Sequence, residues 1–290
     1  MKIMPKNLNI LYTFKCNFQC EHCCFLCSME RKEKLDKAIV ENILMDAKAI
    51  SSIENVNFSG GEIFLFYDEI YDVLLNAKKK GFFVTCTTNG YWGQERENAF
   101  KIVNELKKAK LDLLSISIDV FHIKFIEWES IRNIILASKK LFLPIELKGV
   151  YFKGYPSIYD IVRNHPDDVL DVPINDHLGL NIGRAEKFSH IAYQNESISQ
   201  RCLSIGNDVT IYPDGSVIPC CSPCMTADIL RIGNVFSDSF FQIIENLSNN
   251  ILVKKIRKYG IGIVNCKNSG TLCNSCVEAC RRYLKGGAFR

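Results

Sequence analysis

The chain has 290 residues, 47% of them hydrophobic, and its 36 basic residues against 32 acidic ones leave a formal net charge of +4. A mean hydropathy near zero excludes both a disordered chain and a membrane protein, and so balanced a charge argues against a nucleic-acid partner. The amino terminus lacks the apolar segment and cleavage site of a signal peptide, and no apolar run approaches about 18 residues. We therefore expect a cytoplasmic protein without membrane association, long enough for one large domain plus a small one.

Short β-like runs alternate with longer helical patterns over the first two thirds of the chain. Such βα units predict a parallel sheet with right-handed crossovers, and six of them predict an α/β fold, a partial (βα)6 barrel. Ligands of such folds lie at the carboxyl ends of the strands. The expected strands are Leu8–Phe14, Val56–Ser59, Phe82–Thr88, Leu111–Asp119, Ile145–Phe152 and Leu178–Ile182, with helices such as Leu35–Ile50 and Glu69–Lys80 between them.

In the last third of the chain, the expected helices and strands are shorter and cysteine is abundant. Residues 186–201 are polar and predict a linker, which places the partial barrel at 1–190 and a small cysteine-rich domain at 191–290. Pro213-Asp214-Gly215 indicates a hairpin turn, with one strand on either side. One helix is expected over Phe240–Tyr259, between two groups of cysteines.

Fourteen cysteines are more than packing explains in a reducing compartment, where disulfides are not expected. Thirteen of them fall in three groups, at 16–27, 202–224 and 266–280. This grouping favours ligation of a metal ion or an iron–sulfur cluster. Cys86 stands apart in an apolar segment, which predicts a buried structural thiol.

Cys16, Cys20 and Cys23 form a C-x3-C-x2-C pattern directly after the first expected strand. Three thiolates can hold three irons of a [4Fe–4S] cluster and leave the fourth iron open to a ligand, whereas a plain electron-transfer cluster takes a fourth cysteine. Zinc is the alternative, because Cys24 and Cys27 add two thiolates to Cys20 and Cys23. The roles of Cys24 and Cys27 are open at this point.

This pattern resembles the radical S-adenosylmethionine (SAM) superfamily, in which the cluster binds SAM and cleaves it to a 5′-deoxyadenosyl radical. The resemblance implies a partial barrel of the radical SAM type, with His22 in the aromatic position that packs on the adenine. It also implies that Gly60-Gly61-Glu62, after the second expected strand, binds the amino group of SAM. Further SAM contacts are expected near the ends of later strands, with a turn or capping role as the alternative for each: Asn89, Ser117, Asp119 and Arg184.

A second set of cysteines, with the segment Ile211–Cys220, resembles the SPASM/twitch extension of peptide-modifying radical SAM enzymes. That extension binds one or two auxiliary iron–sulfur clusters. We expect one auxiliary [4Fe–4S] cluster, and the surplus cysteines leave room for a second; a structural zinc knuckle is the alternative. The expected ligands are Cys202, Cys220, Cys273 and Cys276.

Motifs from the first strand to the last cysteines narrow the resemblance to radical SAM peptide epimerases, among them Asn89–Gly93 and Pro219–Pro223. These enzymes convert L-residues to D-residues in ribosomally synthesised peptides. In that family the second cysteine of the Cys-Cys pair donates a hydrogen atom and an upstream aspartate is functional; here they would be Cys221 and Asp208. A packing role is the alternative for Cys221, and the additional thiol of Cys224 departs from the family pattern.

The resemblance implies two partners, a short ribosomal precursor peptide and an electron donor such as flavodoxin or ferredoxin. Two other functions stay open at this point. One is a radical SAM enzyme that cross-links its peptide through a thioether or carbon–carbon bond, and the other is a zinc-binding interaction protein.

Overall fold

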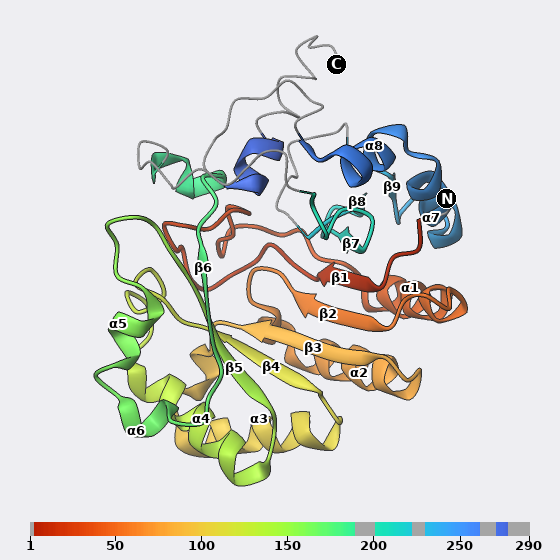
Figure 1. Ribbon diagram of the computed structural model, residues 1–290. Helices are drawn as coiled ribbons and strands as arrows, with labels where there is room; N and C mark the ends of the chain where they lie inside the picture. The colour runs from red at the N-terminus through yellow and green to blue at the C-terminus, as the bar shows by residue number, and fades with distance from the viewer. Residues whose placement is uncertain (1–2, 189–200, 222–229, 262–270, 278–290) are drawn as a thin grey trace.

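Figure 1 shows the computed structural model, which describes residues 3–188, 201–221, 230–261 and 271–277. Its centre is one sheet with the strand order β6-β5-β4-β3-β2-β1-β7-β8-β9. Strands β1 to β6 are parallel, and β7 pairs in parallel with the free side of β1. This is the predicted partial (βα)6 barrel. The strands are β1 (Asn7–Leu11), β2 (Asn55–Ser59), β3 (Phe83–Thr88), β4 (Leu113–Ser117), β5 (Ile145–Tyr151), β6 (Ile174–Leu178), β7 (Asp208–Ile211), β8 (Ser216–Ile218) and β9 (Gly233–Asn234).

Helices follow the first four strands in turn and cover one face of the sheet (Figure 1). In the described residues, none of the helices combines the length and the apolar character needed to span a membrane. The helices are α1 (Lys37–Ala49), α2 (Tyr67–Lys79), α3 (Arg96–Lys108), α4 (Trp128–Leu141), α5 (Ile158–Val162), α6 (Pro166–Val169), α7 (Phe240–Asn249) and α8 (Ile251–Tyr259), with the short 3-10 helices η1 (Ile63–Phe66), η2 (Tyr91–Gly93) and η3 (Gly183–Phe188).

The two faces of the sheet differ in chemistry. Alternate residues such as Leu8, Val56 and Val84 are fully buried in the apolar core. The residues between them, such as Asn7 and Asn55, are polar and half-buried on the opposite, inner face. Parallel sheets usually bury both faces and read as continuous apolar runs. The alternation therefore marks the inner face of this partial barrel as a surface that faces water or a ligand.

Two predicted elements are wrong in position. The sixth strand is Ile174–Leu178 instead of Leu178–Ile182, because it is an edge strand with partly exposed residues and lacks the apolar run expected of it. The helix expected over Phe240–Tyr259 is divided in two at Asn250, whose side chain accepts a hydrogen bond from Val253 N at the start of α8.

The carboxyl-terminal part continues the sheet of the barrel. The hairpin predicted at Pro213-Asp214-Gly215 is confirmed, since β7 and β8 pair antiparallel around it. Cys86 is fully buried, as predicted. Most of the expected linker, residues 189–200, lies outside the described residues, so the domain boundary near 190 stays a prediction.

Candidate functional site

The loop after β1 brings Cys16, Cys20 and Cys23 to one cavity of about 270 Å³, near the carboxyl ends of the strands. Cys16 and Cys20 are buried and Cys23 is half-buried. Cys24 and Cys27, whose roles the sequence left open, line the same cavity. Residues from the ends of later strands complete its wall, among them Ser59, Gly60, Gly61, Thr87, Asn89, Ser117, His122 and Arg184.

The two glycines after β2 hold their loop against the cysteine loop. A Cβ atom on Gly61 would lie 2.2 Å from the carbonyl oxygen of Lys15, and one on Gly60 would lie 2.5 Å from that of Thr13. The N–H of Gly61 donates to the Thr13 oxygen at 2.6 Å, and the N–H of Glu62 donates to the Lys15 oxygen at 2.9 Å. Only glycine allows so close an approach. The pair therefore fixes the position of the cysteine loop as well as lining the cavity.

Glu62 is fully buried, and its carboxylate accepts hydrogen bonds from Asn89 N at 2.7 Å, Thr88 Oγ1 at 2.9 Å and Phe64 N at 3.0 Å. Burial raises the pKa of Glu62 to about 7, against the opposing effect of these hydrogen bonds. Glu62 is not among the described residues that line the cavity; its hydrogen bonds to Thr88 and Asn89 tie the loop after β2 to the end of β3. Its contact with the amino group of SAM stays a prediction.

Two other predicted SAM contacts tie neighbouring loops to the cysteine loop. Arg184 donates from Nε to the carbonyl oxygen of Cys20 at 2.9 Å and from Nη2 to that of Cys27 at 2.8 Å. Asn89 donates from Nδ2 to Asn17 Oδ1 at 2.8 Å, and the same nitrogen lies 3.9 Å from Cys16 Sγ. Both residues line the cavity, so their positions allow a ligand contact in addition to this anchoring.

Asp119 lies just after β4 between two histidines. Its Oδ1 atom is 2.9 Å from His122 Nδ1, and its Oδ2 atom is 3.7 Å from His22 Nε2. Burial lowers the pKa of His22 to about 4, so the ring is neutral near pH 7 and suits stacking on an aromatic base. Burial opposes a charge on His122 as well, yet Asp119 and Cys20 hold its pKa well above the ordinary value.

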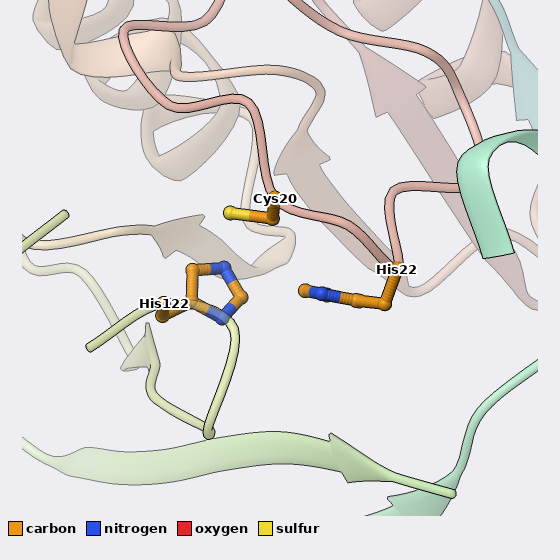
Figure 2. A group of neighbouring side chains, drawn as sticks. All are labelled: Cys20, His22 and His122. Carbon is orange, nitrogen blue, oxygen red and sulfur yellow. The ribbon is translucent and has the colours of Figure 1, made fainter. Parts of the chain in front are cut away.

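Figure 2 shows Cys20, His22 and His122 facing one another, with ligand atoms that lie within 4.8 Å of each other. One thiol and two imidazoles are ligands that zinc accepts. Cys20 also belongs to the three-cysteine pattern, so zinc here and a cluster on that pattern exclude each other. The sequence analysis missed His122; its place three residues after Asp119, in the loop that follows β4, is the signal that could have found it.

The thiols around this cavity differ in acidity. A hydrogen bond from the Cys27 thiol, with help from the Cys27 and Phe25 N–H groups, lowers the pKa of Cys23 to about 6. Burial raises the pKa of Cys16 to about 12. Iron binds the thiolate form. Cys23 is therefore prepared for ligation, whereas a metal must displace the proton of Cys16.

A second cavity, also about 270 Å³, lies on the inner face near the starts of β1, β2 and β3, and it contains the predicted pair Cys221 and Asp208. Cys221 Sγ donates to Ser204 Oγ at 3.5 Å, and Asp208 Oδ1 accepts from Asn7 Nδ2 at 2.5 Å. Cys221 is an exposed residue, yet the atoms around its Sγ desolvate the thiol, and with the negative charge of Asp208 they raise its pKa. The thiol therefore keeps its proton at neutral pH.

The two cavities follow one another along the same face of the sheet. On β3, Thr85 lines the second cavity and Thr87 lines the first; on β2, Asn57 and Ser59 are divided in the same way. Residues two apart in a strand share a face and are about 6.6 Å apart. A group held between the cavities would thus have the cysteine loop on one side and Cys221 on the other.

The four cysteines expected to bind an auxiliary cluster lie within the described residues. Burial raises the pKa of Cys202, and the negative charge of the Cys276 thiolate adds to this rise. The second and third groups of cysteines therefore lie close to each other. Asn181 N donates to Asn274 Oδ1 at 3.1 Å, so the segment 271–277 lies against the chain after β6. A shared cluster stays a prediction, and Cys224, Cys266 and Cys280 lie outside the described residues.

Two family profiles match the chain. The profile of the radical SAM superfamily matches residues 10–140, and that of the SPASM iron–sulfur cluster-binding domain matches residues 202–277. The chain therefore contains a radical SAM domain and a carboxyl-terminal SPASM domain. Such a protein binds SAM on a [4Fe–4S] cluster, and its SPASM domain implies auxiliary iron–sulfur clusters. The three-cysteine cavity and its neutral His22 ring fit this cofactor pair.

The chain is similar to YydG of Bacillus subtilis (strain 168), whose name places it in peptide biosynthesis, with 27% identity over 265 residues that cover 88% of this chain and 81% of YydG. Among solved structures, it shares its fold with BtrN in complex with AdoMet and 2-DOIA (TM-score 0.59, 14% identity, 94% of this chain and 93% of BtrN). It also shares the fold of anSMEcpe with bound AdoMet (TM-score 0.57, 14% identity, 97% and 95%).

Proposed function

We propose that this radical SAM protein epimerises an L-residue to a D-residue at Cα in a short ribosomally synthesised precursor peptide. The similarity to YydG, named for peptide biosynthesis, supports a peptide substrate. So does the shared fold with anSMEcpe, which has also been solved with bound Kp18Cys and Cp18Cys peptides. The observation that carries the proposal is the place of the Cys221 thiol, beside Asp208 in the inner-face cavity that follows the SAM cavity along the sheet.

Epimerisation needs a hydrogen atom removed from one side of Cα and another returned from the opposite side. When bound, the cluster and SAM supply the 5′-deoxyadenosyl radical that removes the first hydrogen. Cys221 then returns a hydrogen atom, so that its S–H bond breaks as the new Cα–H bond forms. One electron from a donor such as flavodoxin or ferredoxin, with one proton, restores the thiol.

The neighbours of Cys221 support this role. A thiolate has no hydrogen to give, so a donor cysteine must stay protonated, and the raised pKa of Cys221 satisfies that requirement. Asp208 contributes to the raised pKa and is itself held by Asn7 of β1. Ser204 Oγ accepts a hydrogen bond from the Cys221 thiol and so orients its S–H bond.

The test is Cys221→Ala in the cluster-loaded enzyme, with a candidate precursor peptide taken from a short open reading frame beside the gene. The variant should still form 5′-deoxyadenosine in the presence of peptide but yield little D-residue. The wild type in D2O should place one deuterium at the modified Cα, because the thiol hydrogen exchanges with solvent. Cys86→Ala, which removes a thiol buried on the helix side of the sheet, should keep both activities.

Peptide cross-linking is the second candidate, because a SPASM domain with auxiliary clusters suits it equally. A cross-linked product would be two hydrogens lighter than the peptide and would carry no new deuterium at Cα. Full epimerisation by Cys221→Ala would remove Cys221 from the mechanism and leave Cys224 as the next thiol to test.

A further inference from the structure

Four asparagines form a block on the inner face of the sheet, beside the thiol cavity. The parallel register of β1 and β2 pairs Asn7 with Asn55 and Asn9 with Asn57. All four side chains line the cavity that holds Cys221. We call these four residues the amide ladder. It fills a place where a parallel sheet normally carries apolar side chains.

Internal hydrogen bonds use only part of the ladder's capacity. Asn55 Nδ2 donates to Asn7 Oδ1 at 2.8 Å, Asn9 Nδ2 lies 3.4 Å from Thr210 Oγ1, and Thr85 Oγ1 donates to Asn57 Oδ1 at 2.9 Å. Among the described residues, Asn9 Oδ1, Asn55 Oδ1 and Asn57 Nδ2 have no protein partner. A carboxamide offers both a donor and an acceptor, so the ladder presents both kinds of group to the cavity.

The spacing of the ladder matches an extended peptide. Successive rungs are two residues apart along a strand, about 6.6 Å, and peptide groups that face the same side of an extended chain repeat at the same distance. Main-chain N–H and C=O groups need the complementary acceptors and donors that the ladder offers. Among the described residues that line this cavity, Asp208 alone carries a formal charge, so most of the polar groups open to a ligand there are neutral.

We propose that the amide ladder binds the main chain of the substrate peptide, extended along β1 and β2, and so holds one Cα between the SAM cavity and Cys221. The inference rests on the proposed function for the substrate class. Recognition of peptide groups leaves the side chains of the substrate free of these contacts. The ladder therefore fixes the direction in which the peptide chain runs and how far it enters the barrel. Residues around the cavity select the sequence of the peptide.

The experiment measures binding of acetyl-hexaalanine amide, a probe whose polar groups are main-chain amides alone. Equilibrium dialysis uses radiolabelled probe and anaerobic cluster-loaded enzyme with SAM but without reductant, so no turnover occurs. Asn9→Val and Asn57→Val should each weaken binding about 2- to 12-fold, the range for one neutral hydrogen bond. Asn164→Val, an exposed position between α5 and α6, should leave binding unchanged.

A second measurement changes the probe instead of the protein. Methylation of alternate amide nitrogens in the probe should weaken binding to the wild type by a similar factor, and the valine variants should lose less. Failure of the wild type to bind the probe, or equal binding by wild type and both variants, would overturn the ladder. Neither result depends on epimerisation, and loss of D-residue formation with intact probe binding would overturn only the proposed function.

Discussion

Two cysteines at opposite ends of the inner face, Cys23 and Cys221, have pKa values shifted in opposite directions. At the carboxyl ends of the strands, the Cys27 thiol and nearby N–H groups lower the pKa of Cys23 to about 6. At the amino ends, burial and the charge of Asp208 raise the pKa of Cys221. A thiolate ligates iron, whereas only a protonated thiol can give up a hydrogen atom. The thiol of Cys23 is thus suited to metal ligation, and the thiol of Cys221 to the hydrogen donation proposed for it.

The ends also differ in how the chain builds them. The cluster cavity is made from short motifs, each directly after a strand. The thiol cavity joins residues that are distant in sequence, since the hydrogen bond from Asn7 to Asp208 spans 201 positions. The cysteines of the first cavity lie close together in the sequence, while the thiol cavity depends on how β7 pairs with β1. The experiments below separate the two ends.

The largest effect is expected at the cluster end. Replacing Cys16, Cys20 and Cys23 together with alanine removes the thiolates expected to hold the SAM-cleaving cluster, so 5′-deoxyadenosine formation should fall to zero. Iron bound by the SPASM domain should remain, because its expected ligands lie elsewhere. Chromatographic detection of 5′-deoxyadenosine and an iron count measure both. Retained SAM cleavage in the triple variant would contradict the assignment of these cysteines.

Glu62→Gln should have the next largest effect and leave the thiol end intact. If the carboxylate accepts the SAM ammonium, its loss should weaken SAM binding about 10- to 150-fold, the scale of about 1.5–3 kcal/mol for a hydrogen bond to a charged group. Equilibrium dialysis with labelled SAM measures this. Thr88→Val removes one hydrogen bond to Glu62 without changing the charge. An equal loss in both variants would show that Glu62 acts only by holding its loop.

The smallest change is expected from Asp208→Asn at the thiol end. Removing the negative charge should lower the pKa of Cys221, because that charge and burial keep it raised. In the proposed mechanism the protonated thiol is the hydrogen donor, so D-residue formation should persist up to this pKa and fall above it; the variant should lose activity at a lower pH than the wild type. Alkylation of Cys221, followed by mass spectrometry across a pH series, reports the pKa directly.

The control for that experiment is Asp171→Asn, an exposed aspartate before β6, which should leave the alkylation profile of Cys221 unchanged. An unchanged profile in Asp208→Asn as well would mean that Asp208 does not control the thiol. SAM cleavage should be unaffected in either variant, since the cluster end is built from other residues.

Sequence by itself determined the βα order, the partial barrel and the three-cysteine loop, because each depends on periodicity or on spacing within a few residues. It misplaced β6, an edge strand without an apolar run, and missed His122, which carries no motif of its own. The roles of Gly60 and Gly61 also needed coordinates: their contacts with Thr13 and Lys15 show that they hold the cysteine loop. Only the tertiary structure decided that Asn7, Asn57, Asp208 and Cys221 share one cavity. Strand register places them there, and register is set by pairing between strands far apart in the chain, which no local pattern records.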